Sequence, residues 1–344
     1  MIDWITGKFP FYINGLISGG EFLSIDVDGV IETRTVKRKI IPGSYSSNIT
    51  IRTFNVDDKG NTCEVELSGN PVKFLQGHNL FGTSDAVNLI FETLEKISTI
   101  LGVKQPLAFY DAWATAKGTI SRVDINKMFS TGSRANALQW LHSASTSSRT
   151  RSQSATTRGS TVYFNGGSRR WTIKAYSKGQ ETELPRNNKQ GLLELTPSMK
   201  AWANDSLRIE LTLKSNELRL LNLHTLASFA KMDIYELFDN YWARVAMADQ
   251  LELEVDLIHT LKGAVRNTYS SWLLGLDCRS IMSRTTFYRH RQELLKYGID
   301  ITIAKEQSNV IPMIRTIVLE PLGIPDWATG TELLYEPRKH YRHG

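Results

Sequence analysis

Three short segments combine acidic, basic and phenolic side chains at the two-residue spacing of a β-strand. They read "ISRVDIN" (120–126), "IKAYSK" (173–178) and "LRIELTLK" (207–214). Successive side chains of a strand point to opposite faces, so each segment separates a polar face from an apolar one. The polar faces carry Arg122, Asp124 and Asn126, then Lys174, Tyr176 and Lys178, and finally Arg208, Glu210 and Thr212.

If the three strands lie side by side in one antiparallel sheet, these side chains outline a site for metal-assisted phosphoryl transfer. Asp124 and Glu210 supply carboxylate oxygens, which suit Mg²⁺ or Mn²⁺. Such an ion polarises a phosphoryl oxygen, and the hydroxyl of Tyr176 can attack the phosphorus in line. Lys178 would stabilise the phenolate or the charge developing on the phosphate. The polar face of an ordinary antiparallel sheet shows the same alternation, so spacing alone leaves this interpretation open.

The charge distribution indicates an anionic partner. The chain carries a net charge of only +6, yet residues 125–180 contain no Asp or Glu. An even distribution of the 35 acidic residues would place roughly six in such a window. Because Lys and Arg neutralise phosphates, nucleic acid is the most economical partner. The basic residues of this window are Lys127, Arg134, Arg149, Arg151, Arg158, Arg169, Arg170, Lys174 and Lys178.

Strand and helix signals in the first two hundred residues predict the sheet that must position these groups. Strand patterns cover 20–34, 47–57 and 61–69, and Asn165-Gly166-Gly167 marks a hairpin. Helical periodicity follows "FGTSD", where Thr83 or Ser84 can serve as the cap, and a shorter helix covers 133–144. The Ser/Thr/Arg-rich segment 143–160 is predicted to be a polar loop.

From about residue 215 the pattern becomes helical. Apolar positions in 233–245 repeat at helical spacing and are expected to form core. Ser283 can cap a basic helix that carries Arg284, Arg289 and Arg291. Because strand patterns at 299–304 and 310–320 follow this helix, the order suggests a winged helix that reads duplex DNA, with an ordinary surface helix as the alternative.

Length and composition set the class of protein. A chain of 344 residues with 41% hydrophobic residues predicts about two globular domains: an α+β unit over 1–215, a mainly helical DNA-binding unit over 216–330 and a basic tail over 331–344. Cys63 and Cys278 lie far apart and are interpreted as thiols of a reducing cytoplasm. The sequence contains no membrane-length apolar run, no signal-peptide pattern and no phosphate-binding Gly-x4-Gly-Lys-Ser/Thr motif, so neither a membrane location nor ATP hydrolysis is expected.

The motifs and their order resemble the gene II replication initiators of filamentous bacteriophages. The similarity runs over most of the chain, through "QGHNLFGTSD", "ISRVD", "TRSQ", "STVYFNGGSRRWTIKAYSKGQE", "LRIE", "NVIPMIR" and "PDW". The resemblance implies a rolling-circle initiator with an RRM-like antiparallel-sheet nuclease domain. Such an enzyme nicks one strand of double-stranded origin DNA and later rejoins the displaced strand. It would work in the host cytoplasm with a host helicase and DNA polymerase, and a homodimer on DNA stays open.

Residue by residue, the resemblance makes Tyr176 the nucleophile and Lys178 its partner, with Tyr163 as the next choice of nucleophile. Metal ligation is assigned to Asp124, Glu210 and Glu181, with Glu183 as the spare acid. The wider class of tyrosine nucleases often uses a His-hydrophobic-His pair, which this sequence lacks, and His78 is the one histidine proposed as a ligand. DNA contacts are assigned to Arg122, Arg149, Arg151, Arg158, Arg169, Arg170, Lys174, Arg208, Arg284, Arg289 and Arg291.

Two other functions fit the same residues. The polar face of the sheet could hold DNA without cutting it, as in a non-catalytic origin-binding protein. A two-metal endonuclease that uses water is the other alternative, and its cleavage would survive the loss of Tyr176.

Overall fold

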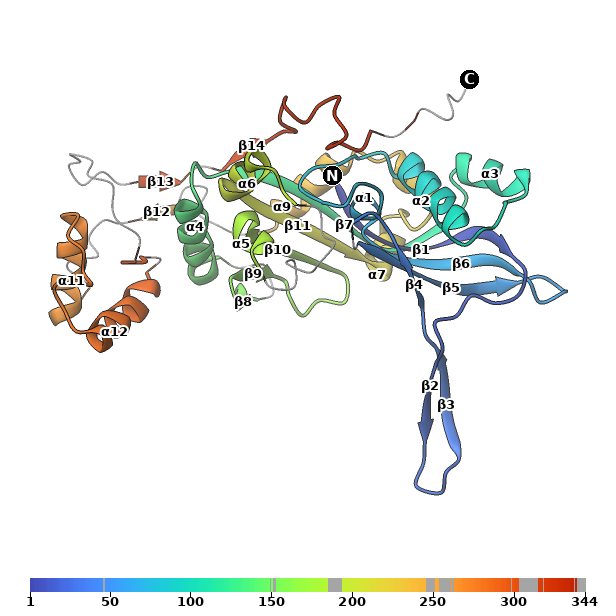
Figure 1. The fold of residues 1–344 in the computed structure, drawn as a ribbon, viewed down its shortest axis with the longest axis horizontal. Coiled ribbons are helices and arrows are strands. Elements are labelled where there is room, and N and C mark those ends of the chain that lie inside the picture. The colour runs from blue at the N-terminus through green and yellow to red at the C-terminus, as the bar shows by residue number, and fades with distance from the viewer. Residues whose placement is uncertain are drawn as a thin grey trace.

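The computed structural model describes residues 1–45, 47–148, 150, 153–184, 194–245, 251–253, 261, 263–297, 299–302, 315–317, 319–336 and 338. It has a large antiparallel sheet in the first two thirds of the chain and further helices toward the C-terminus (Figure 1). The predicted α+β class is therefore confirmed. None of the helices within the described residues combines the length and the apolar character needed to cross a bilayer.

The main sheet has ten strands. Nine follow the order β4-β5-β6-β1-β7-β11-β10-β9-β8, and the tenth, β14, also pairs with β7. Every pair within it is antiparallel. The strands are β1 (Ile2–Ile13), β4 (Lys39–Pro42), β5 (Asn48–Val56), β6 (Thr62–Gly69), β7 (Thr119–Ser130), β8 (Thr156–Arg158), β9 (Thr161–Phe164), β10 (Trp171–Ser177), β11 (Ser206–Lys214) and β14 (Glu320–Leu322).

Helices cover the apolar face of this sheet. Val123, Ile125, Ile173, Ile209 and Leu211 are fully buried there, in one core with side chains from α2, α4, α8 and α9. The helices are α1 (Pro71–Gln76), α2 (Ala86–Ile100), α3 (Leu107–Ala114), α4 (Arg134–Ser147), α5 (Lys178–Thr182), α6 (Pro197–Asn204), α7 (Ser215–Leu220), α8 (Leu226–Ala230), α9 (Ile234–Trp242), α11 (Gly263–Leu273) and α12 (Arg284–Leu295).

Local predictions were right about most elements and less accurate about their ends. The hairpin at Asn165 joins β9 to β10, and Asn165 adopts the positive φ of 58° that such turns favour. Helix α2 is capped by Asp85, whose carboxylate accepts from the Asn88 amide at 3.0 Å, instead of by Thr83 or Ser84. The predicted loop 143–160 is shorter than expected, because its two ends belong to α4 and β8.

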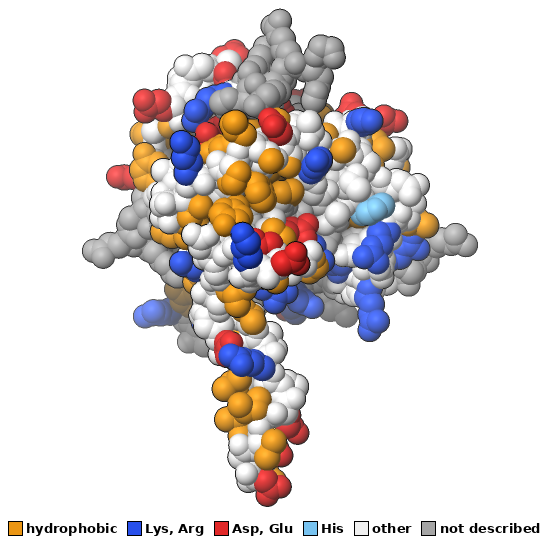
Figure 2. Space-filling model, turned by 90° about the vertical axis from the view of Figure 1, so that its right-hand side faces the viewer, with side chains coloured by type: hydrophobic (Ala, Val, Ile, Leu, Met, Phe, Trp, Pro, Cys, Tyr) orange, Lys and Arg blue, Asp and Glu red, His pale blue; other side chains and the backbone are white. Residues whose placement is uncertain are grey.

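A hairpin of β2 (Glu21–Ile25) and β3 (Ile31–Val36) projects away from the sheet (Figure 1). All residues of both strands are exposed, including Phe22 and Ile31. Figure 2 shows apolar side chains along this arm and acidic ones toward its end. The acidic end does not suit contact with DNA phosphates.

Helices α11 and α12 have a small core of their own. Tyr269, Cys278, Phe287, Leu294 and Ile301 are buried together, apart from the core of the main sheet. As predicted, Ser283 caps α12 and accepts a hydrogen bond from the Thr286 amide at 3.3 Å.

The strands expected after α12 differ from the prediction. Residues 299–302 contain no strand, and 303–314 lie outside the described residues. Strand β13 (Arg315–Ile317) pairs with β12 (Leu251–Leu253), and the following β14 pairs with β7 of the main sheet.

The helices and loops after residue 215 pack in three different places. Leu218, Phe229 and Phe238 of α7 to α9 are buried in the core of the main sheet, although they follow residue 215. The expected core role of 234–245 is confirmed. Near the C-terminus, Leu333 and Leu334 pack with Leu80, Phe81 and Met199, so part of the predicted tail is docked. The compact unit around α11 and α12 therefore covers only about 261–302.

Candidate active site

The register of three central strands brings the predicted polar side chains together. On β10 and β11, Lys174 lies opposite Glu210 and Tyr176 opposite Arg208. On β11 and β7, Glu210 lies opposite Asn126, and Thr212 lies opposite Asp124. The prediction that these strands are neighbours is confirmed. Two of the carboxylates and the phenol consequently share one face of the sheet.

Glu210 connects Tyr176 to Lys174. The phenol of Tyr176 donates a hydrogen bond to Oε2 of Glu210 at 3.3 Å, and Nζ of Lys174 lies 2.6 Å from Oε1. Burial, followed by the negative charge of Asp3, raises the pKa of Glu210 to about 8. Burial, followed by the charge of Glu210, also raises the pKa of Tyr176. The phenol thus needs help to ionise, and the carboxylate that accepts its hydrogen bond has become more basic than an ordinary glutamate.

Asp124 forms a bidentate ion pair on the same face. Its two carboxylate oxygens accept from Nε and Nη2 of Arg122 at 2.8 and 2.7 Å. The carboxylate is buried, whereas the Arg122 side chain is 44% exposed and lies over the ring of Trp4. Arg122 can therefore reach a phosphate from solvent, as predicted for a DNA contact, while Asp124 orients it.

Asp3 is a third carboxylate of the site, and it is absent from the residues predicted from the sequence. Its Oδ1 accepts from the side-chain amides of Asn70 and Asn79, both at 2.9 Å, and lies 3.4 Å from Nη1 of Arg208. No strand was predicted over 1–13, and the register of β1 shifts between Ile2 and Trp4. The available signal was the alternation of apolar and polar residues in "MIDWITGKF".

Lys178 and Glu181 lie on α5 instead of on the strand. Ser177 ends β10 and accepts from the Gln180 amide at 3.4 Å, which starts the helix. The ammonium of Lys178 is buried and donates to Oδ1 of Asn79 at 3.0 Å and to Glu181 at 2.9 Å. Burial lowers the pKa of Lys178, followed by the nearby charge of Arg208. The spare acid, Glu183, pairs with Arg134 at the surface.

Arg208 lies opposite Tyr176 on the same sheet face but is buried under the loop around Asn79, which corrects its predicted role as a DNA contact. Its side chain is fully inaccessible, and its guanidinium donates to the carbonyl oxygens of Asn79 and Leu80 and to Sδ of Met128. These donors leave no exposed group for a phosphate. Together with the pair to Asp3, they fix the loop around Asn79 against the sheet.

Replacing Arg208 with methionine is therefore expected to lower the free energy of unfolding by about 3–5 kcal/mol, since the change leaves Asp3 and two carbonyl groups buried without their partner. Urea titration of both proteins would measure the loss. Arg219→Met, at an exposed position on α7, is the matched control and should change stability by less than about 0.5 kcal/mol. Equal losses in both variants would show that Arg208 has no such role.

His78 also differs from its predicted role as a metal ligand. Its Nε2 lies 2.7 Å from the carbonyl oxygen of Leu333, and Nδ1 accepts from the amide of Leu80 at 3.3 Å. Both ring nitrogens are therefore used within the fold, and the ring packs edge-on against Phe81. In this conformation His78 braces the docked C-terminal segment, and both of its nitrogens are already used.

The stability of the protein is expected to depend on pH through His78. Burial lowers the pKa of His78 from 6.5 to about 4. As the pH falls from about 6.5 to 4, the unfolded chain takes up this proton first, so His78 lowers the free energy of unfolding. At pH 5 the loss is about 2 kcal/mol. Thermal or urea unfolding of wild type and His78→Gln at pH 7 and 5 would measure it, and parallel losses in both proteins would contradict the assignment.

The remaining predicted DNA contacts fall into two regions. Arg158, Arg169 and Arg170 are exposed near the hairpin of β9 and β10, although Arg170 pairs with Glu217 at 2.5 Å. Arg149 and Arg151 lie outside the described residues. On α12, the predicted contacts Arg284 and Arg289 are exposed.

Arg291 differs from its neighbours on α12. Its guanidinium forms two hydrogen bonds with Asp300, at 2.7 and 2.6 Å, and these hydrogen bonds lower the pKa of Asp300 to about 2. The ion pair with Asp300 gives Arg291 a structural role in addition to its predicted contact with DNA.

The donor chemistry of the site suits a divalent cation, but the ligands are not preassembled. Within the described residues, no three Asp, Glu, His or Cys side chains are grouped closely enough to hold a metal. Burial, followed by the charges of Asp3 and Asp124, nevertheless raises the pKa of Glu210, and a divalent cation would relieve the repulsion among these carboxylates. Arg122 and Lys174 now neutralise Asp124 and Glu210, so they would have to release these carboxylates for a metal to bind.

Comparisons with known proteins cover almost the whole chain. Residues 1–232 match the N-terminal part, and residues 256–333 the C-terminal part, of a family described as "Replication-associated protein" of phages. The replication-associated protein of Enterobacteria phage I2-2 is 33% identical over 94% of this chain and 95% of its own length. The proteins of that name from Salmonella phage IKe and Enterobacteria phage M13 are 23% and 25% identical, over 92% and 95% of this chain and 87% and 98% of their own lengths.

Proposed function

The chain belongs to the replication-associated protein family of filamentous phages, and from this premise we propose that it initiates phage replication by nicking one strand of the origin through Tyr176. The observation that supports this proposal is the hydrogen bond from Tyr176 to Glu210 on a sheet face that also carries Asp124 and Arg122. A tyrosine beside a basic carboxylate and an exposed guanidinium matches the needs of an attack on a phosphodiester.

In the proposed reaction, the oxygen of Tyr176 bonds to the scissile phosphorus, and the bond from phosphorus to the 3′ oxygen breaks. The phenolic proton passes to Glu210, which already accepts the hydrogen bond, and the leaving 3′ oxygen takes a proton from water. The products are a 5′-phosphotyrosine and a free 3′-hydroxyl. Attack of a 3′-hydroxyl on this phosphotyrosine would reverse the step, which gives the strand-joining activity.

We propose that Asp124 and Glu210, with Asp3 or Glu181 nearby, hold the Mg²⁺ or Mn²⁺ ion. When bound, the ion would neutralise charge on the scissile phosphate. Once Asp124 binds the metal and leaves its ion pair with Arg122, the exposed guanidinium of Arg122 would donate hydrogen bonds to a phosphate oxygen. Lys178 holds Asn79 and Glu181 in place and thereby supports the loop that positions Asp3.

The proposed DNA path follows the exposed cations of the described residues. Single-stranded DNA would lie along the polar sheet face beside Arg158 and Arg169, and Arg149 and Arg151 stay predictions. We also propose that the nuclease domain is RRM-like and that the segment around α12 is a winged helix, with Arg284 and Arg289 of α12 facing duplex DNA. In this proposal a helical DNA-binding domain follows the nuclease domain. A host helicase and a host DNA polymerase act with the protein, which binds DNA as a homodimer.

The test uses a single-stranded oligonucleotide from the origin of the phage that encodes this chain, labelled at its 3′ end. Incubation with Mg²⁺ or Mn²⁺ should transfer label to the protein, because the downstream fragment keeps the 5′-phosphotyrosine. A chelator should prevent the transfer. Cleavage without transfer would favour a water-using nuclease, and binding without cleavage, also on supercoiled origin DNA, would favour a non-catalytic origin-binding protein.

A further inference from the structure

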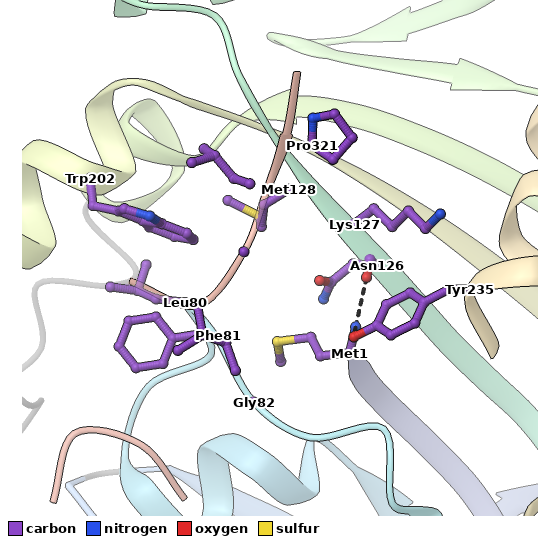
Figure 3. Close-up of a pocket in the computed structure, with 13 residues that line it drawn as sticks. Met1, Leu80, Phe81, Gly82, Asn126, Lys127, Met128, Trp202, Tyr235 and Pro321 are labelled. Atoms are coloured by element: carbon purple, nitrogen blue, oxygen red, sulfur yellow. Dashed lines mark hydrogen bonds between the residues drawn. The ribbon is translucent and has the colours of Figure 1, made fainter. Parts of the chain in front are cut away.

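A pocket opens at the edge of β7, directly beside the candidate active site. Strand β1 pairs with the first part of β7, up to Ile125, and β14 pairs with Met128–Ser130. Between them, the backbone of Asn126 exchanges two hydrogen bonds with Met1, at 2.8 and 2.9 Å. The cavity there has a volume of about 270 Å³. Figure 3 shows it enclosed by the start of β1, the 80–82 loop, α6 and the segment after β14.

Asn126 places an unusual polar group in this pocket. Its side chain is only 1% exposed, and neither its Oδ1 nor its Nδ2 has a hydrogen-bond partner among the described residues. The amide points into the cavity (Figure 3). A buried amide without partners lowers stability by about 1–3 kcal/mol, so its presence calls for a ligand that completes its hydrogen bonds.

The position of Asn126 links the pocket to the proposed chemistry. Along β7, Asn126 follows Asp124 on the same face, and across the sheet it lies opposite Glu210. A strand of DNA whose phosphate lies at Tyr176 and Glu210 therefore passes within reach of the cavity. The reacting phosphate would lie at Tyr176 and Glu210, and a neighbouring nucleotide would lie at the cavity beside Asn126 on the same sheet face.

The walls of the pocket suit a flat, aromatic ligand. Phe81, Trp202, Tyr235 and Ile324 line the cavity. The ring of Phe81 is held edge-on between Trp202 and Trp327, at centroid distances of 5.9 Å each. Stacking on such aromatic side chains is the usual way in which proteins hold unpaired bases.

We propose that this pocket binds one unpaired base of the DNA strand that is cut, and that Asn126 recognises the hydrogen-bonding edge of this base. The inference rests on the proposed function, because that function places single-stranded DNA on this face. An amide offers one donor group and one acceptor, which matches the adjacent donors and acceptors of a base edge. The contact makes Asn126 a specificity-determining residue at one position of the origin.

The same unpaired amide predicts opposite effects of one substitution on stability and on recognition. Asn126→Leu, which has nearly the same size, removes the buried polar group and should raise the melting temperature of the free protein. It should also abolish recognition of the base. Asn136→Leu is the matched control, since the buried amide of Asn136 already donates to the carbonyl oxygen of Thr131 at 2.6 Å. This control should melt at a lower temperature and keep base recognition.

The experiment measures equilibrium binding of origin oligonucleotides in which an abasic site replaces each base in turn around the cut. All proteins carry Tyr176→Phe, and a chelator is present, so the measurement does not depend on cleavage. With Asn126 intact, one abasic position should weaken binding by about tenfold or more. The Asn126→Leu variant should bind the intact oligonucleotide more weakly, and the same abasic position should cause little further loss of its affinity.

A flat abasic profile, or one that Asn126→Leu leaves unchanged, would overturn the proposal. Direct binding of free deoxynucleoside triphosphates separates the two sources of a base: a site for free nucleotides would bind them and leave the abasic profile of the oligonucleotide flat. The result is also distinct from a failure of the proposed function. A position-specific effect in a protein that never cuts DNA would preserve the base pocket and remove only the nicking activity.

Discussion

Tyr176→Phe is expected to bind origin DNA like the wild type and to cut it at least about 10³-fold more slowly, without label on the protein. The substitution removes only the hydroxyl that donates to Glu210. The ring still packs on the sheet, and Glu210 keeps its ion pair with Lys174, so the fold and the bound DNA should change little. Transfer of 3′ label to protein on a denaturing gel measures the loss, and a filter or anisotropy assay measures binding.

Tyr163→Phe is the matched control for this variant. Tyr163 belongs to β9 and lies opposite Lys174 of the neighbouring strand β10. It is therefore on the same face as Tyr176, one strand away. Its ring lies near Arg158 instead of near Glu210. The control should keep nearly full label transfer. Loss of transfer in Tyr163→Phe but not in Tyr176→Phe would make Tyr163 the nucleophile, and cleavage that survives both substitutions would exclude a tyrosine nucleophile at either position.

Glu210→Gln is expected to reduce nicking by a factor on the order of 10²–10⁴, because the amide can neither take the phenolic proton nor serve as an anionic metal ligand. The free protein should remain folded. Glutamine has nearly the same size as glutamate, and its amide oxygen can still accept the hydrogen bond from Tyr176. Single-turnover label transfer over a range of Mg²⁺ and Mn²⁺ concentrations would measure the loss. Partial recovery at high metal concentration would assign part of the effect to metal binding.

Glu217 offers a matched buried carboxylate. It also accepts a hydrogen bond from a tyrosine, Tyr241, and it pairs with Arg170, but it belongs to α7. Glu217→Gln should lower stability and leave nicking at permissive temperature nearly unchanged. If both glutamine variants lose label transfer to the same extent while remaining folded, the special role of Glu210 would be wrong.

The sequence was sufficient for the parts of the fold that depend on local periodicity. Two-residue alternation identified β7, β10 and β11, and it put Asp124, Tyr176 and Glu210 on the polar faces of their own strands. Turn and cap chemistry located the hairpin at Asn165 and the start of α12 at Ser283. These signals act over a few residues, and a single sequence records them directly.

Other features required the tertiary structure, because they depend on contacts between residues far apart in the chain. The pairing of β1 with β7 brings Asp3 to the site, and the return of residues 319–335 places the carbonyl oxygen of Leu333 against Nε2 of His78. Burial decides that Arg208 holds the loop around Asn79 instead of contacting DNA, although its alternation is the same as that of the exposed Arg122.

The sequence by itself thus determined which residue types share a face, and through its motifs the family. Only the tertiary structure decided which of those residues reach solvent, which neutralise one another, and that Asn126 faces a pocket. The physical reason is that alternation fixes the direction of a side chain relative to its own strand, whereas burial and charge pairing depend on what the rest of the chain packs against that strand.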